Sequence, residues 1–352
     1  MRLTFSIIYI IIEKVLSELD LSKIRLRSTY YCFRLIYMSQ DSPSKGKPMY
    51  IAGDWGTSNL RLYLCEYNPN GSIALETRYG AGISQISGDF EERFFNLAQE
   101  WLDTYGKMPV LLSGMVGSTI GWKEAPYLDC PVNVNQIAAG RITFQARDVD
   151  FSILSGLKTV NPLTVNDVMR GEELQLLGWM QSNKNTDGRK LFALPGTHNK
   201  WALSQDGAIS TFLTAFTGEL FALLRNHSIL ITEQSSFSFN ESVFLQGVES
   251  SSKSSTTQLV HTLFSTRAKQ VLGDISAEDG LSYLSGLIIG CDVAGALNMF
   301  ENTDEVIVIG DPTLTEHYKL VINSMGRKAI SCDPAAIAIA GFDTIYRSIY
   351  QS

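Results

Sequence analysis

The sequence contains little of the chemistry that builds metal clusters, disulfide frameworks or membrane spans. Its five cysteines are scattered without a Cys-x-x-Cys pair, and its four histidines show no spacing typical of metal ligands. Free thiols are typical of proteins in a reducing cytosol. The mostly apolar run Leu3–Ile12 is far shorter than the roughly 18–20 residues that cross a bilayer. A structural zinc site, a disulfide-bonded fold and a membrane span in this run are therefore not expected.

Positive charge is also scarce. The chain has 29 Lys and Arg against 36 Asp and Glu, which gives a formal net charge of −7. An acidic surface repels nucleic acids and anionic lipids at long range, so we expect neither as a partner. It repels phosphate ligands as well, so any phosphate site must be built locally. Backbone N–H groups, a few cations and a metal ion would have to supply it.

The chain is long enough for more than one core. Its 352 residues predict about two domains, at roughly 100–200 residues per domain. A meander of three strands followed by a helix occurs twice, which indicates two domains on one plan. The expected strands span residues 50–54, 60–66 and 72–78 in the first unit, and 190–194, 201–204 and 208–213 in the second. Polar, turn-rich residues 182–189 separate the units.

The first 48 residues differ in pattern from the rest. Met38 and Met49 lie near the end of this stretch, and the polar residues 39–47 are typical of a linker. We interpret residues 1–48 as a dispensable extension, with membrane targeting as the alternative, although acidic residues argue against a transit peptide. The predicted organisation is an extension (1–48), a first domain (49–186) and a second domain (187–352).

Each predicted unit carries a glycine-containing loop after its first strand. The loops are Asp54–Asn59 (DWGTSN) and Gly196–Lys200 (GTHNK). Glycine lets backbone N–H groups approach oxygens closely, so two facing loops can clamp a triphosphate. Asp54 can hold Mg²⁺ through its carboxylate or through water. The alternative for Asp54 is that of an ordinary hairpin residue before a glycine.

Several longer blocks carry a family resemblance. The chain resembles the 2-dehydro-3-deoxygalactonokinase family of the actin/hexokinase-like superfamily, from about Met49 to its C-terminus. The matching blocks are GDWGTSNLRLYL (53–64), SGMVGSTIGWKEAPYLDCPV (113–132), VMRGEELQLLG (168–178), LPGTHNKW (194–201), TGELFALLRNHSIL (217–230), LSGLIIG (284–290) and VIGDPTLTEHY (308–318). Seven blocks in order are far more specific than one glycine loop.

The resemblance implies a fold and an activity. The expected fold is α/β, with two ribonuclease H-like (actin/hexokinase-like) domains and an active-site cleft between them. The expected enzyme is a cytoplasmic kinase that uses ATP and Mg²⁺. It would phosphorylate 2-dehydro-3-deoxy-D-galactonate at its 6-hydroxyl in galactonate breakdown. The stereochemistry of the sugar acid is not readable from the residues, and a homodimer is left open.

The loops then receive expected roles. The metal ligand would be Asp54. The residues expected to bind the nucleotide are Gly56, Thr57, Ser58, Asn59, Gly196, Thr197, His198, Lys200, Gly310 and Thr313. The loop at Gly310 and Thr313 follows a very apolar strand, which is a usual ligand position in α/β sheets, and resembles the superfamily's adenosine loop. A plain strand-to-helix turn is the alternative for this loop.

The sugar acid requires cations for its carboxylate. Lys123 and Arg170 are the candidates, with solvated surface positions as the alternative. Gly117 and Trp122 belong to a glycine-rich, apolar stretch that we interpret as backbone packed against the substrate. A tight buried turn is the other interpretation of that stretch.

The attacking hydroxyl requires a carboxylate within hydrogen-bond reach. Glu172 is our candidate for this base, and Asp167 is the second candidate. A carboxylate in the first turn of a helix is also stabilised by the helix dipole, which is the structural alternative for Glu172.

Two other function classes remain open at this point. A phosphohydrolase on the same fold would position water and would need no sugar pocket. A non-catalytic sugar sensor usually carries a DNA-binding helix-turn-helix, and the apolar N-terminal stretch is too short for a convincing one.

Overall fold

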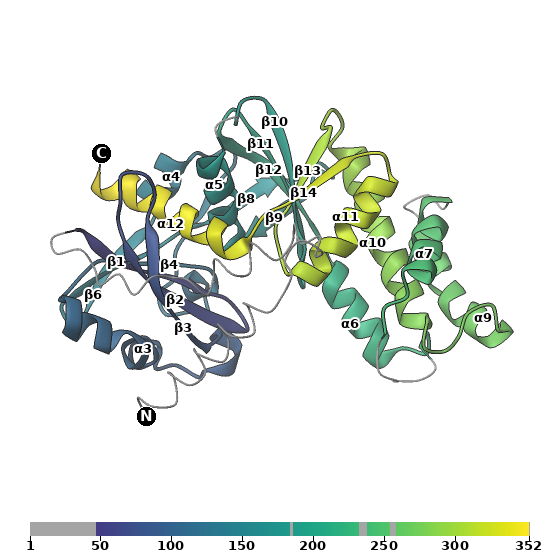
Figure 1. Ribbon diagram of the computed structural model, residues 1–352, viewed down its shortest axis with the longest axis horizontal. Helices are drawn as coiled ribbons and strands as arrows, with labels where there is room; N and C mark the ends of the chain where they lie inside the picture. Colours follow the sequence, from purple (N-terminus) through teal and green to yellow (C-terminus); the bar gives the residue numbers. More distant parts are fainter. Residues whose placement is uncertain (1–46, 184–185, 232–237, 254–257, 352) are drawn as a thin grey trace, which may run out of the picture. The chain divides into compact units, whose positions relative to one another are not determined.

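The computed structural model describes residues 47–183, 186–231, 238–253 and 258–351 (Figure 1). These residues belong to one compact unit, Gly46–Ser352. The predicted extension lies almost entirely outside the described residues, and so does the alternative of a targeting segment. The described unit is of the mixed α/β class, with three separate sheets.

The first half is built on a six-stranded sheet. In spatial order its strands are β3 (Ile73–Ala81), β2 (Asn59–Glu66), β1 (Met49–Trp55), β4 (Val110–Ser113), β7 (Val149–Ile153) and β6 (Ile142–Ala146). The strands β1, β2 and β3 form an antiparallel meander, and β4 and β7 continue from β1 in parallel. This confirms the meander expected in the first unit.

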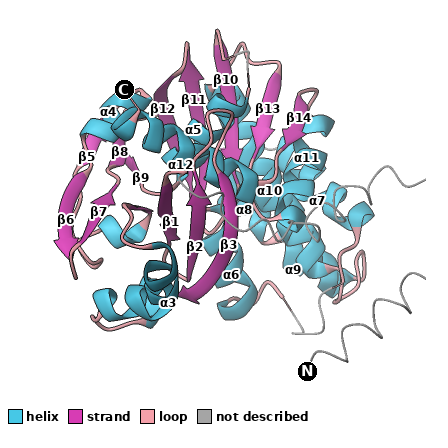
Figure 2. Cartoon of the chain, turned by 60° about the vertical axis from the view of Figure 1, so that its left-hand side comes forward, coloured by secondary structure: helices cyan, strands magenta, loops and turns pink. Residues whose placement is uncertain are grey.

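The second half repeats this order in a five-stranded sheet. Its strands are β12 (Ala208–Ala215), β11 (Asn199–Gln205), β10 (Arg189–Leu194), β13 (Glu305–Val308) and β14 (Lys328–Ser331). Again the first three strands in sequence are antiparallel, while β13 and β14 run parallel to β10 (Figure 2). The predicted internal repeat of the meander is confirmed at the level of strand order and direction.

A small third sheet lies outside the repeat. It consists of β5 (Tyr127–Asp129), β8 (Gly156–Val160) and β9 (Asn166–Met169). The sequence pattern did not predict this sheet, because its strands are short and largely exposed. A further backbone bridge, between Val132 and Ile209, joins the first half to β12.

The helices cover the sheets and differ between the halves. Those of the first half are α3 (Phe90–Tyr105), α4 (Val134–Ala139) and α5 (Glu172–Ser182). Those of the second half are α6 (Thr217–His227), α7 (Glu241–Lys253), α8 (Leu259–Leu263), α9 (Ser265–Leu272), α10 (Gly280–Met299), α11 (Pro312–Ser324) and α12 (Pro334–Tyr350). In the described part of the sequence, the helices α7 to α10 lie between α6 and β13, whereas α3 and a short 3-10 helix (Ile83–Gln85) lie between β3 and β4.

Among the residues that the structure describes, one apolar helix is long enough to cross a membrane by length and composition alone. It is α10, and 78% of its apolar window is buried inside the fold. It packs against α7, and glycines make this contact close: a Cβ on Gly286 would clash with the carbonyl oxygen of Phe244. A mostly buried core helix passes the same test of length and composition.

The C-terminal helix α12 packs on the first half. Gly178 of α5 packs closely on the backbone of α12, and Gly341 of α12 packs closely on the backbone of α5. A Cβ on either glycine would meet a carbonyl oxygen of the other helix. Asp343 of α12 is 2% exposed and accepts hydrogen bonds from Ser72 and Arg347. The first and second halves therefore share a continuous core, which includes residues of β1, α5, β10 and α12.

Candidate functional site

Both predicted glycine loops line one cleft. Gly56 and Thr57 follow β1, Gly196 and Thr197 follow β10, and together they border a cleft of ≈ 710 Å³. Gly310, which follows β13, borders it too. These loops lie at the carboxyl ends of strands that pair in parallel, β1 with β4 and β10 with β13. That edge of an α/β sheet is the usual ligand position.

The loops present backbone donors rather than acceptors. The carbonyl oxygens of Gly56 and Thr57 accept hydrogen bonds from the N–H groups of Ile83 and Ser84. Within the described residues, by contrast, no acceptor is found for the N–H groups of Thr57, Ser58, Thr197 and His198. Unpaired N–H groups beside a cleft are suited to oxygens of an anion.

Asp54 lies at the base of the first loop. It is opposite Arg61 in the β1–β2 pair and beside Ser113 in the β1–β4 pair, and its Oδ2 lies 3.8 Å from Nη1 of Arg61. Burial raises the pKa of the Asp54 carboxyl, and Arg61 counteracts part of this increase. In the part of the chain that the structure describes, no cluster of three or more His, Cys, Asp or Glu could hold a metal alone. A Mg²⁺ ion that arrives with nucleotide phosphates requires only one or two carboxylates, and Asp54 fits that need.

Two adjacent carboxylates begin α5. Glu172 lines the cleft, and its Oε2 accepts a hydrogen bond from the N–H of Arg170 at 3.0 Å. Burial raises the pKa of Glu172, Lys200 lowers it, and Asp54 raises it further. Glu172 therefore interacts electrostatically with both Lys200 and Asp54.

Glu173 is fully buried behind Glu172. Its Oε1 accepts a bond from Oγ of Ser113 at 3.2 Å, and its Oε2 accepts one from the N–H of Gly171 at 2.6 Å. Gly171 has a positive φ of 111° and lies against Gly114, so this turn brings the start of α5 next to the first loop. Burial and the neighbouring Glu172 raise the pKa of Glu173 from 4.5 to about 8.

Asp167, our second candidate for the base, is occupied by hydrogen bonds. Its Oδ1 accepts from the N–H of Val168 at 2.8 Å and from Oγ1 of Thr214 at 2.6 Å. Its Oδ2 accepts from the N–H of Thr214 at 2.7 Å and from Nδ2 of Asn161 at 3.2 Å. A carboxylate has about four acceptor positions, so these bonds leave none for a substrate hydroxyl. The arrangement favours a structural role for Asp167 over that of a base.

Arg170 is 8% exposed and borders the cleft. Its Nη2 donates to the carbonyl oxygen of Ala125 at 2.7 Å, and its guanidinium lies 4.3 Å from the centre of the Tyr127 ring. Its Nη1 is buried and has no hydrogen-bond partner among the described residues. A Cβ on Gly117 would lie 2.8 Å from that nitrogen, so glycine at this position leaves the space that Arg170 occupies.

Trp122 and Lys123 lie away from the cleft lining. The Trp122 ring packs within an aromatic cluster, with ring centres 5.0 Å from Phe151 and 5.1 Å from Phe144. Lys123 is exposed, with its Nζ 5.8 Å from the Phe144 ring centre. The glycine-rich stretch therefore includes core packing as well as residues near the cleft. The exposed Ser58 and Asn59 belong to the first loop but are not in the cleft lining either.

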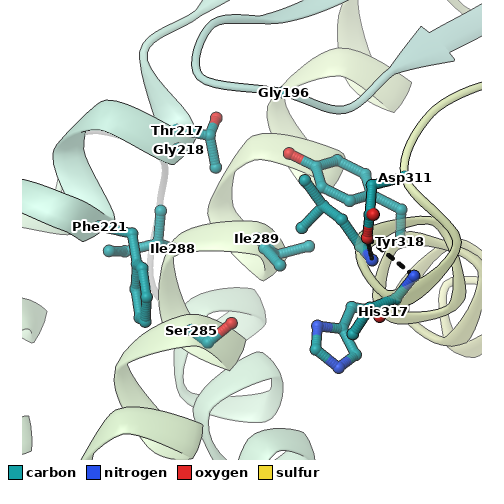
Figure 3. A pocket seen from close by; sticks show the side chains of 12 residues that line it. Gly196, Thr217, Gly218, Phe221, Ser285, Ile288, Ile289, Asp311, His317 and Tyr318 are labelled. Atoms are coloured by element: carbon teal, nitrogen blue, oxygen red, sulfur yellow. Dashed lines mark hydrogen bonds between the residues drawn. The ribbon is translucent and has the colours of Figure 1, made fainter. Parts of the chain in front are cut away.

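A second pocket of ≈ 220 Å³ adjoins the cleft at Gly196. Figure 3 shows Phe221 and Ile288 on one side of it, and His317 and Tyr318 on the other. Thr313, which we expected near the nucleotide, lines this pocket rather than the cleft. It lies in the first turn of α11, which Asp311 caps by accepting from the N–H groups of Thr313 and Leu314.

His198 lies on the exposed side of the second loop. Its Nε2 is 2.6 Å from Oε2 of Glu219, and its ring stacks on Phe216 with centres 5.5 Å apart. Since His198 also lines the cleft, a bond to a phosphate would either come from Nδ1 or replace the contact of Nε2 with a carboxylate.

Some residues of the cleft were missed in the sequence. Arg61, Met115, Tyr127 and Gln175 all line it. Arg61 could have been found, because it lies opposite Asp54 once the β1–β2 hairpin is paired around its loop. Tyr127 comes from the third sheet, which no local pattern predicted.

The comparisons with known proteins agree with this arrangement. The family model for 2-keto-3-deoxy-galactonokinase matches residues 54–345, which include both glycine loops and the start of α5. The chain belongs to the 2-keto-3-deoxy-galactonokinase family. The family resemblance drawn from the sequence blocks is thereby confirmed.

Curated and solved relatives cover most of the chain. A probable 2-dehydro-3-deoxygalactonokinase of Rhizobium meliloti is 32% identical over 304 residues, which are 86% of this chain and 97% of that protein. The 2-dehydro-3-deoxygalactonokinase of Escherichia coli is 33% identical over 291 residues, or 82% and 92% of the two chains. The crystal structure of a Sinorhizobium meliloti protein, provisionally described as a 2-dehydro-3-deoxygalactonokinase, superposes with a TM-score of 0.76 at 32% identity. It covers 86% of this chain and 100% of that one.

The buried Glu173 predicts a specific pH dependence of stability. Its folded pKa of about 8 is higher than its ordinary 4.5, so the folded state keeps a proton that the unfolded state loses. The free energy of unfolding should therefore fall as the pH rises from about 4.5 to about 8. Glu173→Gln keeps the shape of the protonated acid and should remove this contribution.

Urea unfolding of both proteins, from about pH 5 to about pH 9, measures the effect. The difference in unfolding free energy between Glu173→Gln and wild type should grow with pH in favour of the variant. Glu124→Gln, at an exposed position, serves as the control. Parallel stability curves for wild type and Glu173→Gln would contradict the assignment.

Proposed function

We propose that this protein transfers the γ-phosphoryl group of ATP to the 6-hydroxyl of 2-dehydro-3-deoxy-D-galactonate, in the cytoplasmic breakdown of galactonate. The observation that carries the proposal is that the two glycine loops border one cleft, with N–H groups at Thr57, Thr197 and His198 for which the described residues offer no acceptor. The family membership supports the same reaction and gives no support to the alternatives of a phosphohydrolase or a sensor. Phosphoryl transfer depends mainly on positioning and charge neutralisation, which such loops provide.

The proposal includes two ribonuclease H-like domains, at residues 49–186 and 187–352, that are preceded by the extension 1–48. The shared strand order of the two large sheets supports it. So does the position of the cleft, whose lining comes from both halves. The partners we propose are ATP and the sugar acid, without nucleic acid or membrane, and a homodimer is left open.

ATP is assigned to the second half of the cleft and to the adjoining pocket. The adenine ring would lie among Phe221, Ile288 and Ile289, since flat apolar rings suit such a pocket. The β- and γ-phosphates would then reach the N–H groups of Thr197 and, across the cleft, Thr57. Mg²⁺ would be held by Asp54 with the phosphate oxygens, and it would neutralise part of their charge.

The sugar acid is assigned to the first half. Its carboxylate would bind Arg170, whose Nη1 is a buried donor without a partner among the described residues. Guanidinium and carboxylate match in charge and geometry. Gly117 contributes space for Arg170, and Tyr127 covers one face of the guanidinium.

Glu172 is assigned as the base. The 6-hydroxyl oxygen attacks the γ-phosphorus, the bond from that phosphorus to the bridging oxygen breaks, and ADP leaves. The hydroxyl proton passes to the Glu172 carboxylate. Burial raises the pKa of this carboxyl, which strengthens it as a proton acceptor, and Lys200 opposes part of that rise.

The test of the function is ADP release from ATP and Mg²⁺ with a panel of sugar acids. Release should depend on 2-dehydro-3-deoxygalactonate, and be much weaker with its gluconate epimer, with galactonate or without sugar. Release without any sugar would favour a phosphohydrolase. Binding of the keto acid without release would favour a sensor.

Asp54→Asn should abolish most of the Mg²⁺-dependent turnover, because an amide cannot supply the negative charge that attracts the metal. We expect a loss in kcat of at least about 100-fold with the fold retained. Turnover measured against Mg²⁺ concentration checks this, with Asp103→Asn on the exposed face of α3 as the control. Unchanged turnover and unchanged Mg²⁺ dependence in Asp54→Asn would exclude the metal role.

Arg170→Lys should weaken binding of the sugar acid, because an ammonium cannot reproduce the flat, two-pronged guanidinium. We expect the KM for the keto acid to rise by about 10- to 100-fold while the KM for ATP stays within about twofold. Steady-state kinetics in both substrates measure this, and Arg93→Lys on the surface of α3 is the control. An equal rise in both KM values would point to a general structural defect instead.

A further inference from the structure

Asp292, in the middle of α10, lies outside both the cleft lining and the pocket lining. Its carboxylate nevertheless accepts hydrogen bonds from four side chains. Oδ1 accepts from Nε1 of Trp201 at 2.8 Å. Oδ2 accepts from Nδ2 of Asn199 at 2.8 Å, from Oγ1 of Thr217 at 2.8 Å and from the hydroxyl of Tyr318 at 2.6 Å.

The four donors come from three elements around the pocket. Asn199 and Trp201 lie at the start of β11, directly after the second glycine loop. Thr217 is the first residue of α6, and Tyr318 lies on α11. Thr217 and Tyr318 also line the ≈ 220 Å³ pocket on either side of Gly196, as Figure 3 shows. One carboxylate thus fixes the loop-bearing strand and two pocket walls.

Only an ionised carboxylate satisfies this set of donors. It accepts at about four positions and donates at none. The indole N–H of Trp201 can only donate. If an asparagine replaced Asp292 with its NH₂ toward this N–H, two donors would face each other without an acceptor. An amide NH₂ turned the other way would face Nδ2 of Asn199, which only donates, and two hydroxyls that would have to accept instead of donating. Burial raises the pKa of Asp292, and its four donors counteract this increase.

We infer that Asp292 is a positioning residue for the nucleotide: it holds the second phosphate loop and the walls of the adjoining pocket in the arrangement that binds ATP. The inference rests on the proposed function, since it assigns this pocket to the nucleotide. It predicts different effects on the affinities for the two substrates, because none of the four donors lies in the half of the chain that is assigned to the sugar acid. Loss of Asp292 therefore weakens ATP binding and leaves the affinity for the keto acid unchanged.

The chain offers a matched control in Asp343. This carboxylate is also buried and accepts from the N–H and Oγ of Ser72 and from Nε of Arg347. It anchors α12 to the first half and touches neither the cleft nor the pocket. A change to Asn at Asp343 removes a comparable buried charge without altering the nucleotide region.

The experiment compares Asp292→Asn and Asp343→Asn in the full chain, by steady-state kinetics and by calorimetric titration with ADP. In Asp292→Asn the KM for ATP should rise by at least about tenfold, as expected for disrupted hydrogen bonds to a charged group. ADP affinity should fall by a similar factor, and the KM for the keto acid should stay within about twofold. In Asp343→Asn the melting temperature should fall, with both KM values unchanged.

Tyr318→Phe provides a second variant that removes one donor and keeps the ring. It should raise the KM for ATP by about threefold or more, and its effect should not add to that of Asp292→Asn, since the two share one interaction. If Asp292→Asn fails to fold, Tyr318→Phe and Thr217→Val carry the test through the same two KM values.

The outcomes separate this inference from the proposed function. A folded Asp292→Asn that binds ADP as tightly as wild type overturns the inference alone. An equal rise of both KM values also overturns it, because it indicates a general structural defect. A wild-type protein that neither binds ADP nor turns over ATP overturns the proposed function, and the inference with it.

Discussion

The buried ammonium of Lys200 joins the two halves of the described unit beside the cleft. Its Nζ donates to the carbonyl oxygen of Val168 at 2.8 Å and to Oγ1 of Thr214 at 2.6 Å. Thr214 in turn donates to Asp167 through both its N–H and its hydroxyl. A buried charge must find hydrogen-bond acceptors, and here they come from β9 of the first half and β12 of the second. The position of the cleft walls relative to each other depends on this contact.

The hydrogen bonds of Lys200 also bear on how a chain with a net negative charge can bind anionic ligands. Among the described residues, neither Lys200 nor Arg170 forms an ion pair within 4.0 Å, since the acceptors recorded for both are neutral oxygens. An acidic partner would already cancel much of each charge. Neutral acceptors satisfy the hydrogen bonds and leave the charge to act on ligand oxygens in the cleft. Glu172 and Glu173 still interact electrostatically with Lys200 and Arg170, but they form no direct ion pair with them among the described residues.

Local patterns in the sequence predicted the parts of the fold that depend on neighbours in the chain. The two meanders, the glycine loops that follow β1 and β10, and the start of α5 after Gly171 all agree with the structure. The third sheet was missed because its strands are three to five residues long and pair across distant segments. Trp122 was expected at the substrate, but its ring joins an aromatic cluster whose other members are spread along the sequence. The two bonds from Thr214 to Asp167, and those of Asp292, also depend on long-range pairing, which neither composition nor spacing reveals.

The strand β11 connects these separate features. Side chains alternate across a strand, so Asn199 and Trp201 face Asp292 of α10 while Lys200, between them, faces the first half. The second glycine loop leads directly into this strand. A shift of the loop on nucleotide binding would move Asn199 and Lys200 together, since they are adjacent on one paired strand. The pocket proposed for the nucleotide and the contact between the halves are therefore linked through three consecutive residues. For a kinase this link has a clear use, because water is excluded from the transferring phosphoryl group only when both halves enclose it.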